Sequence, residues 1–224
     1  MKALLYKELR LAMHPICYLF IVLFPFMLLI PSYPVAIGFI YVLACYPILF
    51  LGANKGQQSN DLLYSVLLPI RKKDIVLARI FTVSLMQLVF ILIMSALYPL
   101  ALMIRKNIPN TADVGIGLSG FVSVLGVALV GFAIADLIFF PIYYKHGKSI
   151  VMSTLLTILG FIFYLSIFTI GLPYVPGLEG YKTALCDSGL GVQFGVLGGA
   201  LVIYVLLHIV VYRVSSKLLE KVDF

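Results

Sequence analysis

The sequence predicts an all-α integral membrane protein with six transmembrane helices. Of its 224 residues, 62% are hydrophobic and 11% are charged, a composition far from that of a soluble domain. The charged residues leave long uncharged runs at 11–54, 80–104, 114–135, 149–178 and 188–212. A helix needs about 20 apolar residues to cross a hydrocarbon core of about 30 Å. The first run therefore holds two spans, and each of the others holds one.

We expect a single transmembrane domain over residues 1–224. Its predicted spans lie near 14–30, 35–53, 78–104, 114–140, 149–171 and 190–212.

The N-terminal segment 1–13 predicts a helix that lies in the plane of the lipid headgroups. One face of this helix is apolar, and it consists of Leu4, Leu5, Leu9 and Met13. The opposite face is charged, and it consists of Lys2, Lys7, Glu8 and Arg10. This division is typical of an interfacial helix. The alternative is a simple extension of the first span.

The segment 54–77 predicts a cytoplasmic loop with a short amphipathic helix. Ser59 or Asn60 can cap this helix, and Asp61 then falls in its first turn, where the helix dipole favours a negative charge. Pro69 ends the helix, and its apolar stripe consists of Leu62, Leu63, Val66 and Leu67. Two turns are too short to be stable alone in water, so the helix must pack on the membrane, the protein or a partner.

The basic residues predict the orientation. If both termini are cytoplasmic, thirteen of the sixteen lysines and arginines lie inside, and only Arg105, Lys106 and Lys182 lie outside. This asymmetry follows the positive-inside rule. It accounts for the net charge of +7 by topology and attraction to anionic lipid, so no nucleic-acid partner is expected.

The sequence contains no pattern that predicts catalysis. His and Glu do not recur at a metal-ligand spacing, and no acid–base pair is evident beside a Ser or Thr. We therefore expect no catalytic residue, no metal site and no cofactor bound by this chain.

Apart from cysteines, the ionisable residues at depth are Asp136 and His208. Asp136 lies about one turn from the inner end of the fourth span, where it can reach water or pair with a lysine. Two roles stay open for it: a structural ion pair or polar anchor, and a part in transport or gating.

Small residues repeat in the sixth predicted span. Gly191, Gly195 and Gly199 share one helical face, and such a face lets two helices approach closely. The face is predicted to pack against another helix of the same subunit or against a second subunit.

Three stretches together resemble the small permease subunits of ABC-2-type transporters. The first is the run Leu67 to Arg79, in which Leu-Pro is followed by a basic cluster, Asp-Ile-Val and Arg. The second is the N-terminal run Lys2 to Arg10, and the third is the run Pro141 to Gly147 after the fourth span. With the six-span layout, the resemblance covers essentially the whole chain, and it extends to exporters of phenol-soluble modulins and antimicrobial peptides.

The resemblance implies a permease of the bacterial plasma membrane that exports hydrophobic or amphipathic substrates. It implies that two cytoplasmic ABC ATPase subunits bind ATP and Mg²⁺, and that a second permease copy or paralogue completes the complex. The implied ATPase contacts are Asp61, Leu62, Leu63, Tyr64, Val66, Leu67, Arg71, Lys72 and Asp74 around the coupling helix, with Tyr144 and Lys145 as a smaller contact. The alternative is a membrane scaffold that binds a cytoplasmic partner through 54–77 without transport.

Overall fold

The protein is helical throughout the residues that its computed structural model describes, which are 2–9, 15–30, 71–106, 120–146, 150–168 and 189–221. These residues contain no strand. The elements are α1 (Lys2–Lys7), α2 (Pro15–Leu23), the 3-10 helix η2 (Phe24–Leu29), α5 (Lys72–Lys106), α6 (Phe121–His146), α7 (Ile150–Ser166) and α9 (Leu190–Glu220). The predicted all-α class is confirmed for this part of the chain.

Three helices are long and apolar enough to cross a membrane, namely Lys72–Ile104, Phe121–Lys145 and Leu190–Glu220. Two shorter apolar helices, Ile16–Leu29 and Ile150–Ser166, correspond to the predicted first and fifth spans. The predicted second span, 35–53, and most of the loop 54–77 lie outside the described residues. Six spans therefore stay a prediction.

The helices extend beyond the predicted spans. Helix α6 continues through Pro141 to His146, where the sequence predicted a loop from 141 onward. Proline removes one backbone hydrogen bond, and membrane helices tolerate this loss when neighbouring groups compensate for it. Helix α5 begins at Lys72, and Asp74 in its first turn donates its backbone N–H to the Arg71 carbonyl over 2.9 Å.

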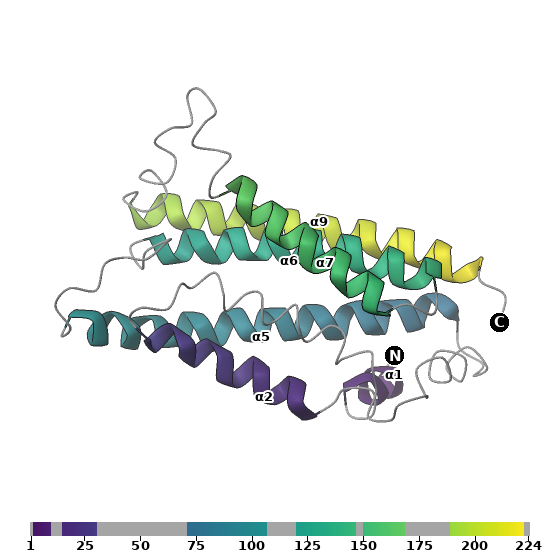
Figure 1. The fold of residues 1–224 in the computed structure, drawn as a ribbon, viewed down its shortest axis with the longest axis horizontal. Helices are drawn as coiled ribbons and strands as arrows, with labels where there is room; N and C mark the ends of the chain where they lie inside the picture. The colour runs from purple at the N-terminus through teal and green to yellow at the C-terminus, as the bar shows by residue number, and fades with distance from the viewer. Residues whose placement is uncertain are drawn as a thin grey trace, which may run out of the picture.

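Two layers of helices pack against each other (Figure 1). Helix α6 packs along α9 and α7 in one layer, whereas α5 contacts η2 and α2 in the other. Between the layers, α5 contacts α9 more extensively than it contacts α6. The two layers are therefore joined by the contacts that α5 makes with α9 and α6.

Small residues allow the close packing inside the first layer. A Cβ atom added at Gly126 of α6 would lie 3.4 Å from the Ala200 Cβ of α9, and one added at Gly131 would lie 2.6 Å from Phe161 Cε2 of α7. Phe161 is fully buried and stacks on Phe132 with a centroid distance of 6.1 Å. These α6 glycines, which the sequence reading did not single out, lie where the helices meet.

The predicted glycine face of α9 lies elsewhere. Gly191, Gly195 and Gly199 are exposed, and a Cβ atom added at any of them would meet nothing within 4 Å. Among the described residues no helix packs on this face, so its partner, within the subunit or in a second subunit, stays a prediction. The side of α9 that faces α6 carries Ala200, Tyr204 and Val211 as buried residues.

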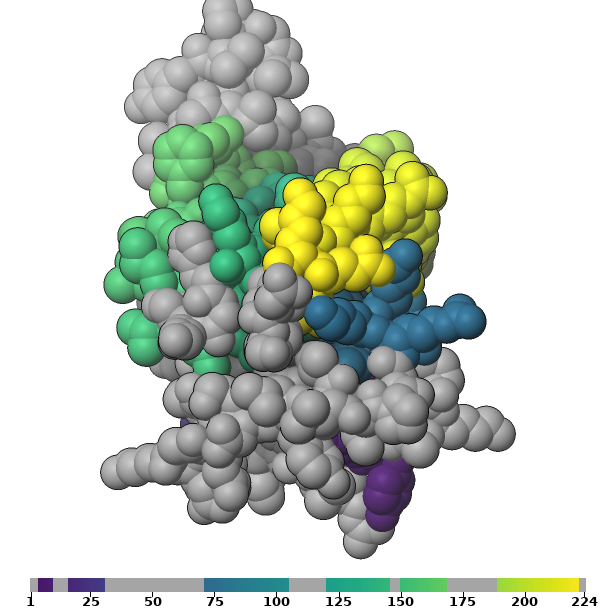
Figure 2. Space-filling model, turned by 90° about the vertical axis from the view of Figure 1, so that its right-hand side faces the viewer, coloured from purple at the N-terminus to yellow at the C-terminus, as the bar shows by residue number. Residues whose placement is uncertain are grey.

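The start of α5 and the ends of α6 and α9 lie at one end of the molecule, as does α1 (Figure 1). Figure 2 shows this end, with the last turns of α9 in yellow directly beside the first turns of α5 in blue. Several basic residues gather here, namely Arg71, Lys72, Lys73, Lys145, Arg213, Lys217 and Lys221. The predicted orientation places these basic residues on the cytoplasmic side.

Candidate functional site

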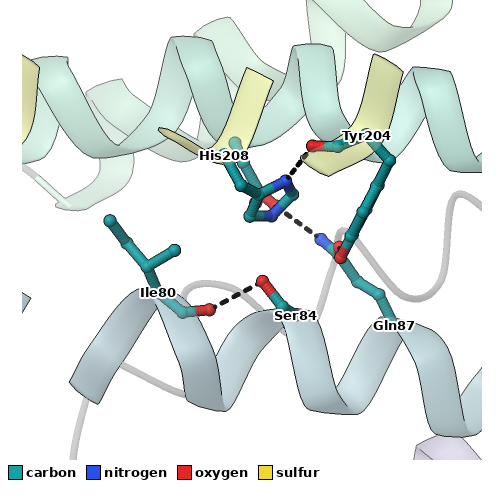
Figure 3. A network of polar contacts seen from close by, with 6 residues as sticks. Ile80, Ser84, Gln87, Tyr204 and His208 are labelled. Atoms are coloured by element: carbon teal, nitrogen blue, oxygen red, sulfur yellow. Dashed lines mark hydrogen bonds and ion pairs between the residues drawn. The ribbon is translucent and has the colours of Figure 1, made fainter. Parts of the chain in front are cut away.

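A buried cluster of polar side chains joins the two layers (Figure 3). Gln87 of α5 donates from Nε2 to Asp136 Oδ2 of α6 over 3.0 Å. The Tyr204 hydroxyl of α9 donates to Gln87 Oε1 over 2.7 Å, and His208 Nε2 lies 3.0 Å from the same Asp136 Oδ2. One amide thus bridges a carboxylate on one helix and a phenol on another.

The cluster is almost completely shielded from solvent. Asp136 is 0% exposed, Gln87 1% and Tyr204 4%, and the His208 side chain is 12% exposed. A charged group in such surroundings is costly unless it is paired and hydrogen-bonded. Asp136 can therefore occupy this position because it contacts Gln87 and His208. These contacts also hold α5, α6 and α9 in place relative to one another.

The depth of Asp136 differs from the sequence prediction. Because α6 continues to His146, Asp136 lies ten residues before the helix end, which corresponds to about 15 Å. The sequence placed it about one turn from the inner end of the fourth span, where it could reach water or pair with a lysine. In the structure, the carboxylate contacts a histidine and an amide within the bundle.

A second buried connection lies nearer the basic end of α5. Arg79 Nε is 3.5 Å from Glu8 Oε1, and Arg79 Nη1 donates to the Tyr143 hydroxyl of α6 over 3.0 Å. The Arg79 guanidinium also lies 5.9 Å from the centre of the Tyr143 ring, within the range of a cation–π contact. Arg79 is 4% exposed and Glu8 is 5% exposed, so this ion pair joins the N-terminal segment, α5 and α6.

A third connection is at the surface. Lys73 Nζ lies 3.2 Å from Glu220 Oε1, and the two side chains are 53% and 46% exposed. Exposed ion pairs contribute about 0–1 kcal/mol. The pair marks where the first turn of α5 meets the last turn of α9.

The predicted ATPase contacts fall into three groups. Asp61, Leu62, Leu63, Tyr64, Val66 and Leu67 lie outside the described residues. Arg71 is exposed, while Lys72 and Asp74 are half-buried at the start of α5. Lys145 is exposed at the end of α6.

Tyr144 differs from its neighbour Lys145. Its side chain is buried, at 2% exposed, and its ring lies 5.1 Å from that of Tyr143. In this conformation Tyr144 packs inside the bundle, and the expected contacts of Tyr144 and Lys145 with an ATPase stay predictions.

Sequence reasoning missed Gln87, Tyr204 and the pairing of Arg79 with Glu8. It noted His208 and Asp136 as ionisable residues at depth but did not bring them together. A signal was present, since Gln87 is an isolated amide inside an apolar run, as Asp136 and His208 are isolated ionisable groups. Which of them meet depends on helix rotation, which the uniformly apolar helices do not reveal.

Within the described ranges, no three His, Cys, Asp or Glu residues lie together in a way that could hold a metal ion. The buried ionisable pairs described above are one carboxylate with one imidazole, and one carboxylate with one guanidinium. Such pairs are suited to holding helices together.

The comparisons with known proteins agree with the helical membrane architecture. No curated protein and no solved structure was found to match this chain. A family profile described as "ABC-2 family transporter protein" matches residues 3–220, which is nearly the full length of 224 residues. The predicted family is confirmed: this chain belongs to the ABC-2 family of transporter proteins.

Proposed function

We propose that this chain is the permease subunit of an ATP-driven exporter that moves hydrophobic or amphipathic molecules outward across a bacterial plasma membrane. Membership of the ABC-2 family supports a permease role and association with an ABC ATPase. Two permease subunits, either identical copies or paralogues, and two ATPases would form the working complex. ATP and Mg²⁺ would be bound by the ATPases.

The observation that carries this proposal is the set of contacts that hold α5 against its neighbours. The segment 54–77 runs into α5, and the first five turns of α5 carry three connections to other parts of the chain. In order along α5, Lys73 contacts Glu220, Arg79 contacts Glu8 and Tyr143, and Gln87 contacts Asp136 and Tyr204. A displacement of α5 at its basic end would therefore be passed to α1, α6 and α9.

This arrangement supports a mechanical role for the segment before α5. Closure of the ATPase dimer around ATP would push the short helix predicted at 61–68, and α5 would transmit the push. Because α6 and α9 also pack closely on each other, the bundle would move largely as one body. Movement of two such bodies relative to each other would switch the route between them from inside to outside access.

The proposed substrate class rests on two sequence features. The chain resembles exporters of phenol-soluble modulins and antimicrobial peptides over three stretches. It is also strongly hydrophobic, which suits a substrate that partitions into the bilayer. Peptides with an amphipathic helix are the substrates that we would test first.

Replacing Leu62 and Leu67 with Asp tests where the ATPase binds. The two leucines belong to the predicted apolar stripe, and a buried carboxylate there would prevent docking in an apolar groove. We expect the double variant to insert into the membrane but to lose co-purification of the ABC ATPase. Ser65→Asp is the matched control, because it adds a charge to the same helix outside the stripe. Undiminished co-purification of the double variant would contradict the assignment of the coupling helix.

A further inference from the structure

The imidazole of His208 lies between two hydrogen-bond acceptors (Figure 3). Its Nδ1 is 2.8 Å from the Tyr204 carbonyl oxygen, and its Nε2 is 3.0 Å from Asp136 Oδ2. A carbonyl oxygen can only accept a hydrogen bond, so Nδ1 must carry a proton. A neutral imidazole has a single N–H, and it would then present the lone pair of Nε2 to the carboxylate.

Two neighbouring side chains approach one oxygen of the Asp136 carboxylate. Oδ2 accepts an N–H from Gln87 Nε2, and the orientation of that amide is set because Gln87 Oε1 accepts from the Tyr204 hydroxyl. His208 Nε2 is close enough to the same oxygen for an ion pair, yet it is not aligned as a hydrogen bond. A doubly protonated ring would be attracted to the carboxylate across this distance, whereas a neutral ring would turn the lone pair of Nε2 toward it.

We propose that Asp136 and His208 form a buried proton-binding site, and that the bound proton holds α9 against α6 and α5. The ligand of this site is a proton on His208 Nε2. When the proton is present, an imidazolium faces a carboxylate. When it leaves, a buried carboxylate faces a lone pair, and the attraction becomes a repulsion.

The residues around the His208 ring determine at which pH the site holds its proton. Helix α6 contributes Asp136, α9 itself contributes Tyr204, whose ring lies 4.1 Å from that of His208, and α5 contributes the uncharged Gln87 and Ser84. The contact is therefore lost as the pH rises, because deprotonation of His208 Nε2 removes the bound proton. This inference does not rest on the proposed export function.

The direct test is nuclear magnetic resonance of the histidine ring nitrogens in the full-length protein. The chain has three histidines, so replacing His14 and His146 with Asn leaves His208 as the sole signal. We expect ¹⁵N signals of a doubly protonated ring at a pH of about 7.5, where an unperturbed imidazole is mostly neutral. Signals of a neutral ring at this pH would overturn the proposal.

Asp136→Asn in the same background is the partner experiment. Without the carboxylate, we expect His208 to give the signals of a neutral ring at the same pH. A ring that stays doubly protonated in this variant would also overturn the proposal, because Asp136 would not be what holds the proton. Should the variant fail to fold, the measurement with Asp136 in place still decides whether the proton is bound.

A thermal unfolding series separates a proton site from a merely structural contact. The protein with Asp136 should lose stability as the pH rises through the deprotonation of His208, and Asp136→Asn should lack this loss. Phe161→Leu is the matched control, because it weakens the packing of α7 against Phe132 of α6 and lies outside the proton site. It should lower the unfolding temperature by a similar amount at each pH. An unchanged pH profile in Asp136→Asn would contradict the proposed proton site.

Discussion

The ion pair between Arg79 and Glu8 provides the sharpest prediction about how the helices are held together. The two side chains are 4% and 7% exposed, and the charged atoms are 3.5 Å apart. With an effective dielectric constant of about 20, the Coulomb attraction at this distance is about 5 kcal/mol before desolvation is counted. Removing one partner leaves the other charge buried and poorly compensated, which typically costs about 3–5 kcal/mol.

We therefore expect Glu8→Ala and Arg79→Met each to lower the thermal unfolding midpoint by about 6–20 °C, since a chain of this length loses about 2–4 °C per kcal/mol. The double variant should lose clearly less than the sum of the two, because it leaves no unpaired charge. Circular dichroism of the purified protein is the assay, since the chain contains no tryptophan. Single variants within about 2 °C of the parent, or strictly additive losses, would refute the view that this pair fastens α5.

Three further predictions concern packing, surface charge and orientation. Gly131→Ala should destabilise the protein by about 1–3 kcal/mol through overpacking against α7. Gly195→Ala, which faces open space, should leave thermal stability unchanged. Equal changes of thermal stability in the two variants would contradict the packing of α6 on α7. Lys73→Ala should lower the free energy of unfolding by no more than about 1 kcal/mol, because the ion pair of Lys73 with Glu220 is exposed. A larger loss, measured by denaturant unfolding, would contradict the assignment of this pair as a weak surface contact. Arg71→Cys, in a cysteine-free background, should react with a membrane-impermeant thiol reagent from the cytoplasmic side alone, and labelling from outside would reverse the predicted orientation.

The membrane class and the broad placement of the helices were predictable because long apolar runs leave little choice of structure. Three of the predicted spans coincide with helices of membrane length. The ends of these helices were less predictable. The fourth span was expected to end near residue 140, and α6 continues through Pro141 to His146.

The candidate site was harder to predict than the helices. Helices that are apolar on every side do not show which face meets a neighbour, so the partners of Asp136 could not be assigned. The glycines of α9 illustrate the same limit. Their spacing indicated a close approach, but the described glycines that closely approach a neighbouring helix are Gly126 and Gly131 of α6 and Gly160 of α7.

The pairing of Arg79 with Glu8 joins residues 71 positions apart in the chain. No local pattern encodes such a contact. Both residues were visible in the stretches that resemble ABC-2 permeases, and only the fold brings them together.

The measurement that tests the central claim most directly is ATP-dependent uptake into inside-out vesicles that contain the permease with its ABC ATPase. A fluorescently labelled amphipathic helical peptide is the probe, and the Leu62→Asp, Leu67→Asp double variant is the control. The account predicts that the peptide accumulates inside the vesicles with ATP, and that it does not do so without ATP or with the variant. Equal peptide levels with and without ATP, together with ATP hydrolysis that the peptide does not stimulate, would contradict an exporter of such peptides and favour a scaffold without transport.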